Sequence, residues 1–259
     1  AGHILDPPDL TGAPDGANVR GWRGANSVLA QRRHCGVEHL AHGWAVQTKL
    51  WQTPHRTQSC VGRELVEPWL AAQWPEVLTT VQQERRGTGH AVRIALEDLA
   101  ARGIALGAEV IVLTGDTPLL TSATLEALIA THRAESAAAT VLTAVLDDPT
   151  GYGRIIRDDA GLLYKIVEEK DASEDEKLVF EINSGVYIFD FAALTGAISK
   201  LKSNNAQGEL YLTDAIEIIR KDGGKVAPIL CEDFTETLGV NDRVQLAEAA
   251  AILRDRVNE

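Results

Sequence analysis

Hydrophobic and polar residues follow a regular pattern from about residue 63 onward. Apolar residues at helical spacing predict helices over 64–73 (interrupted at Pro68), 89–102, 122–135, 191–201, 213–221 and from 243 onward. Short, mostly apolar runs predict strands over 78–82, 109–113, 139–146, 153–157, 164–168, 184–189 and 225–230. Helices that alternate with buried strands are typical of a parallel-rich sheet covered on both faces. The predicted fold class is therefore α/β, with a mixed, mostly parallel sheet flanked by helices.

Residues 1–62 lack this pattern. Prolines and glycines interrupt residues 1–27 repeatedly. All five tryptophans lie before residue 75, and five of the seven histidines lie before residue 56. This skew indicates a segment of different character from the remainder. We expect it to be irregular, with a short helix near 27–33 as its one regular element.

The composition excludes several classes of protein. Hydrophobic residues make up 45% of the chain and charged residues 24%, which is ordinary for a globular protein. No apolar run approaches the ~18 residues of a membrane span, and no signal-type start is visible, so we expect a cytoplasmic location and no membrane partner. A net charge of -12 argues against nucleic acid as a partner. Three cysteines without metal-type spacing favour free thiols.

Polar residues follow the predicted strands of the first half. Asp116 comes three residues after the buried run 109–113, at the strand end where open α/β sheets bind ligands. A single carboxylate there suits Mg²⁺, although Asp116 could equally cap the next turn. Gly87 and Thr88 precede a predicted helix, so their N–H groups are available to a planar ring or a phosphate, although Thr88 is as readily a plain N-cap. Gln82 could pair its amide with a base edge.

Further polar residues border the strands of the second half. Glu168 and Asn183 could accept from and donate to sugar hydroxyls, and Gly153 would let a ligand approach its main chain. Asn241 could supply a carbonyl oxygen to a metal. Each of these residues, taken singly, fits an ordinary turn or edge position at least as well.

The order of the motifs is more informative than any one of them. From residue 82 onward the chain contains GTGHA, GDTPLL, DDPTGYGRI, INSGVY, SNNAQGELYLTD and GVNDRVQLAE. This series resembles the uridylyltransferase domain of the bacterial bifunctional GlmU family over residues 63–259. The resemblance implies a Rossmann-like nucleotidyltransferase that joins UTP to N-acetylglucosamine 1-phosphate. The implied products are UDP-N-acetylglucosamine and diphosphate, with Mg²⁺ as cofactor.

The resemblance also implies roles for eight residues, in three sets. The uracil-binding residues of the family match Gln82, Gly87 and Thr88, the metal ligands match Asp116 and Asn241, and the residues that hold the acetylated sugar match Gly153, Glu168 and Asn183. Asp116 and Asn241 would also be the catalytic pair, and Asn241 would touch substrate as well as metal. Catalysis in this family requires positioning and charge neutralisation, and no nucleophilic triad is visible in the sequence.

Two departures from the family pattern affect the expected domains. The family opens with a strand, a Gly-rich phosphate loop of the LAAGxGTRM type and a PKVL segment. None of these occurs in residues 1–62, and the chain has no methionine. We therefore interpret 1–62 as an out-of-frame reading of a GC-rich gene, with a genuine replacement segment as the alternative. We expect the sheet to lack a central strand, leaving backbone groups unpaired, and the activity to be weak.

Residues 63–242 then form the nucleotidyltransferase domain. Residues 243–259 match the start of the helix that links it to a β-helical acetyltransferase half, which we expect to lie outside this chain. The homotrimer of the family would form through that half.

Three other functions fit the same residues. The chain could transfer nucleotides to another sugar 1-phosphate, such as glucose 1-phosphate with UTP or dTTP. It could be a sugar-nucleotide-binding remnant without turnover, or a structural scaffold that binds neither ligand. The settings of Glu168 and Asn183 favour an acetylated sugar, and a substrate panel with calorimetry would separate the four functions.

Overall fold

The computed structural model describes residues 28–31, 44–48, 68, 71–72, 78–104 and 106–258, and the first two of these ranges are described as strands only. The strands are β1 (Val28–Gln31), β2 (Trp44–Thr48), β3 (Leu78–Thr79), β4 (Glu109–Thr114), β5 (Ala139–Val145), β6 (Arg154–Arg157), β7 (Leu163–Val167), β8 (Glu181–Asp190) and β9 (Val226–Leu230). The helices are α2 (Thr88–Ala101), α3 (Ser122–Ala134), α4 (Glu174–Lys177), α5 (Phe191–Lys200), α6 (Asp214–Lys221), the 3₁₀ helix η3 (Phe234–Thr237) and α7 (Arg243–Asn258).

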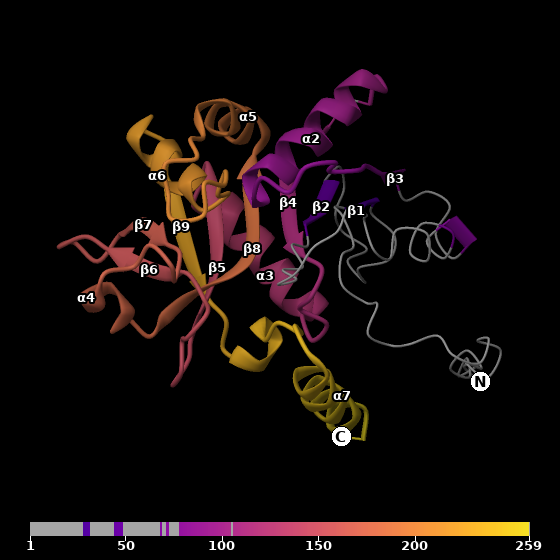
Figure 1. Ribbon diagram of the computed structural model, residues 1–259, viewed down its shortest axis with the longest axis vertical. Helices are drawn as coiled ribbons and strands as arrows, with labels where there is room; N and C mark the ends of the chain where they lie inside the picture. Colours follow the sequence, from indigo (N-terminus) through magenta and orange to yellow (C-terminus); the bar gives the residue numbers. More distant parts are fainter. Residues whose placement is uncertain are drawn as a thin grey trace.

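The strands form one mixed sheet in the order β3-β1-β2-β4-β8-β5-β9, with the β6–β7 hairpin joined to the start of β8 (Figure 1). β2 runs parallel to β4, and β5 runs parallel to β9. β8 lies between β4 and β5 and is antiparallel to both. The expected α/β fold is confirmed. Most strands run in the same direction. β1 and β8 run in the opposite direction and each lies between two of those strands, so most of the strand pairs are antiparallel.

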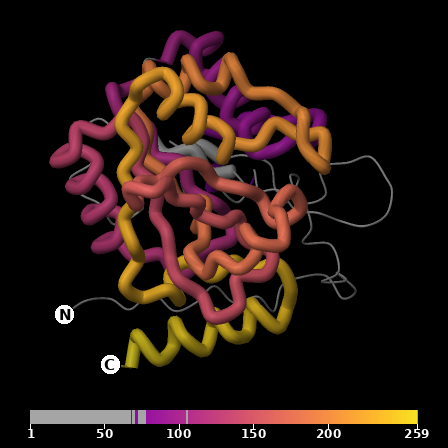
Figure 2. Tube along the Cα trace, turned by 90° about the vertical axis from the view of Figure 1, so that its left-hand side faces the viewer, coloured from indigo at the N-terminus to yellow at the C-terminus, as the bar shows by residue number. Residues whose placement is uncertain are grey.

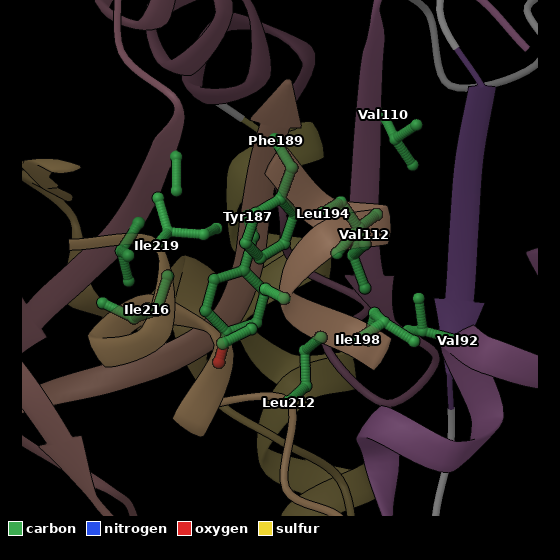
Figure 3. Close-up of a cluster of buried hydrophobic side chains, with 14 of the residues drawn as sticks. Val92, Val110, Val112, Tyr187, Phe189, Leu194, Ile198, Leu212, Ile216 and Ile219 are labelled. Atoms are coloured by element: carbon green, nitrogen blue, oxygen red, sulfur yellow. The ribbon is translucent and has the colours of Figure 1, made fainter. Parts of the chain in front are cut away.

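Two hydrophobic clusters cover the two faces of this sheet. Successive residues of β4 point into different clusters, as the two-residue period of a strand requires. Val110 and Val112 belong to the first cluster, and Ile111 belongs to the second. The first cluster is completed by α2, α5 and α6 (Figure 3), and the second by α3. A fully buried aliphatic side chain contributes about 1.5–3 kcal/mol. The helices therefore lie on both faces, as their apolar spacing predicts.

The first segment departs from the expectation in two respects. Val28–Gln31 is a strand, so the expected helix near 27–33 is wrong. Trp44–Thr48 pairs in parallel with Val110–Thr114, so β4 has backbone partners on both sides and the expected gap in the sheet is filled. Runs of four or five residues are too short for periodicity to distinguish strand from helix. The other residues of 1–62 lie outside the described residues.

Most other element boundaries agree with the expected ones within two residues. Of the helix expected over 64–73, Pro68, Ala71 and Ala72 are helical and the rest lies outside the described residues. The strand expected over 78–82 is shorter, and β8 begins at Glu181, three residues early. Two short helices were not expected, α4 and η3. A capping box between Ser173 and Glu176 is the sequence signal for α4.

Candidate active site

The loops that carry the expected site residues leave the same edge of the sheet. β3, β4 and β9 point in one direction, because the antiparallel strands β1 and β8 separate strands of like orientation. The segments that follow β3, β4 and β9 contain Gln82, Asp116 and Asn241 respectively. Ligands of open α/β sheets bind outside the carboxyl ends of such strands.

The loop between β3 and α2 is shaped by Gln82 and Gly87. The Gln82 side chain is 4% exposed, and its Nε2 donates to the Gly87 carbonyl oxygen at 3.1 Å. The same Nε2 lies 2.9 Å from Nδ1 of His90, which must accept because an amide nitrogen only donates. Gly87 has φ 97°, and an added Cβ would overlap the carbonyl oxygen of Leu210. The loop therefore requires glycine at this position.

His90 is positioned to remain uncharged. Burial, followed by the charges of Arg86 and Arg93, lowers the pKa of His90, and contacts with Glu84 oppose this in part. A neutral imidazole leaves Nδ1 free to accept from the amide. Since both N–H groups of the Gln82 amide then have acceptors, its Oε1 is the atom that it can present to a ligand.

Thr88 connects α2 to the segment 204–213. The cap of α2 is Gly87, and no side chain bonds to the first turn, so Thr88 is not a simple N-cap. Its hydroxyl accepts the backbone N–H of Leu212 at 2.9 Å. The neighbouring Thr213 donates its hydroxyl to Oε1 of Glu168 at 2.9 Å. Two consecutive residues thereby join the expected nucleotide loop to the expected sugar residues.

Gly153, Glu168 and Asn183 lie together although they come from three strand ends. The backbone N–H of Asn183 donates to the Gly153 carbonyl oxygen at 2.9 Å. A Cβ placed on Gly153 would lie 3.6 Å from Oε2 of Glu168. The Asn183 amide Nδ2 donates to the Tyr187 hydroxyl at 2.6 Å, and its Oδ1 accepts from the Gly185 N–H at 3.2 Å. An amide, a carboxylate and a bare main chain therefore border one small region.

The surroundings of Glu168 are acidic and poorly solvated. Burial raises the pKa of Glu168, the Thr213 hydroxyl opposes this, and the charges of Asp214, Asp171 and Glu209 add to it. Burial also raises the pKa of Asp214 to about 6, with Glu217 and Asp171 contributing. Burial and the nearby negative charges therefore disfavour the ionised form of both carboxyl groups.

Asp116 and Asn241 lie on adjacent segments. The N–H of Val240, the residue before Asn241, donates to the Asp116 carbonyl oxygen at 2.8 Å. Asp116 is partly buried and Asn241 exposed. The following helix α3 is capped by Thr121, whose hydroxyl accepts the Thr124 N–H at 3.3 Å, so Asp116 is not needed as its cap.

The strand end also joins Asp116 to the sugar residues. Thr114 precedes Asp116 by two residues, and its Cγ2 would lie 2.5 Å from a Cβ on Gly185 of β8. Asn183 is two residues away on that same strand. All three sets of expected residues are therefore linked through direct contacts or through residues one or two positions away in the chain.

Asp116 and Asn241 are suited to Mg²⁺ by their chemistry. Within the described part of the chain, no group of three or more His, Cys, Asp or Glu residues gathers to hold a metal. One carboxylate and one amide oxygen are nevertheless sufficient protein ligands for Mg²⁺, because waters and substrate phosphates supply its other ligands.

Sequence reasoning missed several residues that the structure places at these contacts, namely Thr213, Tyr187 and His90. All three lie inside the motifs already singled out. The distances along the sequence between these residues and their partners, taken together, follow neither the helical nor the strand period. The sequence pattern therefore does not indicate which of them are in contact.

A model for the family described as nucleotidyl transferase matches residues 49–234. The chain belongs to the nucleotidyl transferase family. The match begins inside the segment that we expected to be unrelated, at the residue after β2. In the described helices, none is long and apolar enough to cross a membrane.

Two curated relatives are bifunctional proteins. The chain is 48% identical over 227 residues to the bifunctional protein GlmU of Thermobifida fusca, a match that covers 87% of this chain and 46% of that protein. It is 52% identical over 198 residues to the bifunctional protein GlmU of Caldanaerobacter subterraneus subsp. tengcongensis, covering 76% of this chain and 41% of the relative. The chain thus spans less than half the length of these relatives.

A solved structure supports the fold. The nucleoside-diphosphate-sugar pyrophosphorylase of Vibrio cholerae RC9 superposes with a TM-score of 0.50 at 15% identity, covering 66% of this chain and 67% of that one. At this identity the similarity concerns the fold alone.

Proposed function

We propose that this chain transfers a uridylyl group from UTP to N-acetylglucosamine 1-phosphate and releases diphosphate. The observation that carries the proposal is the pair of bonds from Leu212 to Thr88 and from Thr213 to Glu168, which brings the expected nucleotide loop beside the expected sugar residues. Similarity to the two GlmU proteins supports the same activity.

Gln82 and Gly87 would hold the base. With its two N–H groups directed at the Gly87 carbonyl and at His90, Gln82 offers an oxygen. An oxygen pairs with a base that has a ring N–H at this edge, as uracil has. Cytosine presents a bare nitrogen there, and two acceptors facing each other repel. Gly87, without a side chain, would leave room for the base to approach the main chain.

Glu168, Asn183 and Gly153 would hold the sugar. The carboxyl group and the amide offer donors and acceptors to hydroxyl and acetamido groups, and Gly153 adds no bulk between them. A sugar without the acetamido group could not make all of these hydrogen bonds. One buried polar group of the protein would then stay unpaired, at a cost of about 1–3 kcal/mol. This cost provides selectivity against a sugar without the acetamido group.

The reaction itself would depend on position and charge. An oxygen of the sugar phosphate attacks the α-phosphorus in line, its new P–O bond forms as the bond to the diphosphate breaks, and the diphosphate leaves with the electron pair. Asp116 and Asn241 would hold Mg²⁺, which when bound neutralises charge on the reacting phosphates. The chain's own residues orient the two substrates, and none is needed to form a covalent intermediate.

Diphosphate release with a panel of substrates tests the proposal. We expect turnover with UTP, N-acetylglucosamine 1-phosphate and Mg²⁺, and weaker turnover with glucose 1-phosphate and either UTP or dTTP. Equal or better turnover with glucose 1-phosphate would identify a different sugar nucleotidyltransferase. If UDP-N-acetylglucosamine binds in calorimetry but no substrate pair turns over, the chain is a binding remnant.

We expect the absolute rate to be low. Residues 1–62 carry no Gly-rich phosphate loop of the family type. Each missing donor to a developing negative charge costs about 2.7–4 kcal/mol. A rate equal to that of a GlmU protein that has the loop would contradict this expectation and leave the substrate assignment standing.

We also propose residues 63–242 as the catalytic domain and 243–259 as the start of a linking helix. In a longer protein that carries an acetyltransferase half, a homotrimer would form through that half. Size measurement by light scattering of the present chain, with a monomer expected, tests this assignment, and a trimer of this chain alone would refute it.

A further inference from the structure

The last helix has few apolar contacts with the other residues that the structure describes. α7 lies at the opposite end from α2, α5 and α6 (Figures 1 and 2). Ala249 is its buried residue, and large apolar side chains on it are exposed, namely Val244, Leu246, Leu253 and Val257. Polar contacts must therefore contribute much of the attachment of α7 to the described residues.

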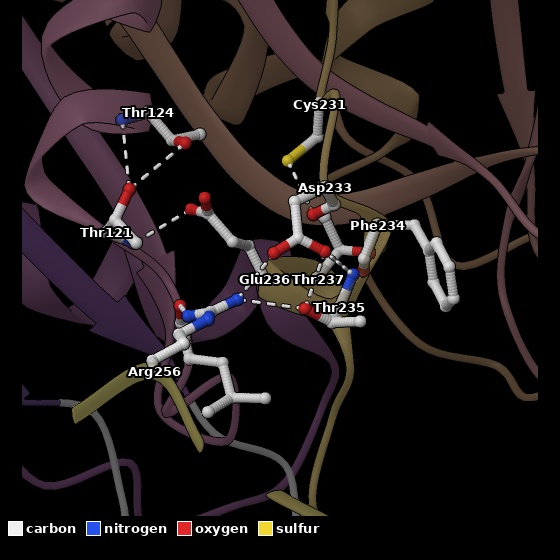
Figure 4. A network of polar contacts seen from close by, with 10 residues as sticks. Thr121, Thr124, Cys231, Asp233, Phe234, Thr235, Glu236, Thr237 and Arg256 are labelled. Atoms are coloured by element: carbon white, nitrogen blue, oxygen red, sulfur yellow. Dashed lines mark hydrogen bonds and ion pairs between the residues drawn. The ribbon is translucent and has the colours of Figure 1, made fainter. Parts of the chain in front are cut away.

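Arg256 of α7 provides such contacts to two segments at once (Figure 4). Its Nη1 donates to the Leu119 carbonyl oxygen at 2.7 Å. Its Nη2 donates to Oδ2 of Asp233 and to the Thr235 hydroxyl, both at 2.8 Å. Leu119 belongs to the segment after β4, and Asp233 and Thr235 belong to the segment after β9. One guanidinium group therefore bridges both.

Two further bonds join the same pair of segments. The Glu236 side chain, 8% exposed, accepts the Thr121 N–H at 2.8 Å. The Val240 N–H donates to the Asp116 carbonyl oxygen at 2.8 Å. Arg256, Glu236 and Val240 thus form three successive links between the segment 115–121 and the segment 231–241.

Asp233 is suited to remain ionised at its end of the bridge. The Thr235 hydroxyl, together with the Thr235 N–H and Arg256, lowers the pKa of Asp233 despite partial burial. A charged acceptor strengthens the bond from the guanidinium group. The planar guanidinium can donate in two directions at once, which the single ammonium of lysine cannot do with the same geometry.

The two bridged segments are those that carry Asp116 and Asn241. Leu119 follows Asp116 by three residues, and Thr235 precedes Asn241 by six. We propose that Arg256 is a positioning residue for the divalent cation, because its bridge between Leu119 and Asp233 is one of the three links that set the separation of Asp116 and Asn241. This inference rests on the proposed function. It assigns to α7, which touches neither substrate in that proposal, an effect on metal affinity.

Metal affinity distinguishes this role from a merely structural one. We would compare Arg256→Ala and Arg256→Lys with Arg254→Ala, a control on the same helix whose side chain is 69% exposed and whose ion pair with Asp255 is long, at 3.8 Å. Mn²⁺ binding to the full chain with UDP-N-acetylglucosamine present is followed by electron paramagnetic resonance, which requires no turnover. The Mg²⁺ dependence of diphosphate release is measured in parallel.

A residue that orients a metal ligand typically contributes 10- to 100-fold to metal affinity. Arg256 acts less directly, through the segments that carry the ligands. We therefore expect Arg256→Ala to weaken Mn²⁺ binding about tenfold, the lower end of that range. Arg256→Lys should lie between Arg256→Ala and wild type, and Arg254→Ala should match wild type. The KM for N-acetylglucosamine 1-phosphate should stay within about twofold, because the sugar residues lie on other segments. Asp233→Asn, which keeps the shape of the acceptor, provides the same test if Arg256→Ala does not fold.

Unchanged Mn²⁺ affinity in a folded Arg256→Ala protein overturns the inference, as does an equal loss in Arg254→Ala. A wild-type chain that releases no diphosphate but binds Mn²⁺ with the expected dependence on Arg256 contradicts the proposed function and leaves the inference standing. A wild-type chain that neither turns over nor binds Mn²⁺ overturns both.

Discussion

The Asn183 side-chain amide donates to the Tyr187 hydroxyl at 2.6 Å although the two residues are four apart in one strand. Four residues of regular strand span about 13 Å, further than these side chains reach between them in an undistorted strand. The strand is distorted here, because the register with β5 shifts between Val141 and Thr143 and Gly185 has φ 80°. The bulge turns Asn183 back toward Tyr187 and so sets the direction of its amide.

Tyr187→Phe should therefore weaken sugar binding. Without the hydroxyl, the Asn183 Nδ2 loses its acceptor, which costs about 1–3 kcal/mol of stability. We expect the KM for N-acetylglucosamine 1-phosphate to rise severalfold while the KM for UTP is unchanged. Tyr164→Phe, which keeps the ring beneath the Arg220 guanidinium, is the matched control. A parallel rise in both KM values would show that Tyr187 has only a general structural effect.

The contact between Gly185 and Thr114 predicts a graded effect on folding. Gly161 and Gly185 both have positive φ, but a Cβ on Gly161 meets nothing within 4 Å, whereas one on Gly185 would lie 2.5 Å from Cγ2 of Thr114. Gly161→Ala should lower the free energy of unfolding by about 1–2 kcal/mol, and Gly185→Ala by about 1–3 kcal/mol more.

Urea unfolding measures both losses. Thr114→Ala removes the atom that clashes, so in the double variant the extra cost of Gly185→Ala should largely disappear. Equal costs for the two glycine substitutions would refute this account.

The raised pKa of Asp214 predicts a dependence of stability on pH. Burial raises this pKa from 3.8 to about 6, so the folded chain binds the proton more tightly than the unfolded chain. The stability that this provides is fully present below pH 3.8 and is lost as pH rises through about 6. The full shift would correspond to about 3 kcal/mol. We expect roughly 1 kcal/mol, because Asp214 is only partly buried and solvent screens it.

Asp214→Asn should remove this loss. Relative to wild type, the variant should gain roughly 1 kcal/mol in free energy of unfolding between pH 4 and pH 7.5, measured by urea titration at both values. Asp159→Asn, at an exposed position, provides the control. A constant difference between Asp214→Asn and wild type at the two pH values would contradict the prediction.

His90 should influence which base is selected. His90→Ala removes the acceptor that fixes the Gln82 amide, so the amide can turn and offer its N–H₂ group to cytosine. We expect the ratio of kcat/KM for UTP to that for CTP to fall about tenfold, the value of one hydrogen bond of ~1.4 kcal/mol. His90→Asn keeps an acceptor near the position of Nδ1 and should restore most of the ratio. Equal ratios in wild type and His90→Ala would exclude this role.

Much of the architecture could be predicted from the sequence because it depends on local periods. The apolar spacing of 89–102 and 122–135 corresponds to α2 and α3, and the apolar run 109–113 corresponds to β4. The start of β8 was expected three residues late, at residue 184, because Asn183 indicates a turn, yet Asn183 lies within a bulged strand. A bulge is stabilised by neighbouring strands, and its own residues do not determine it.

The sequence alone determined the family, the two-sided helical cover of the sheet and the residues at which chemistry was expected, because motif order and periodicity are properties of the chain itself. Only the tertiary structure decided which of those residues meet. Leu212 and Thr88 are 124 positions apart and Thr213 and Glu168 are 45 apart, and only packing of the loops brings them together. It also decided that β2 fills the place beside β4. The ladder is formed by backbone N–H and C=O groups, which every residue but proline carries in full, so side-chain patterns could not indicate that pairing.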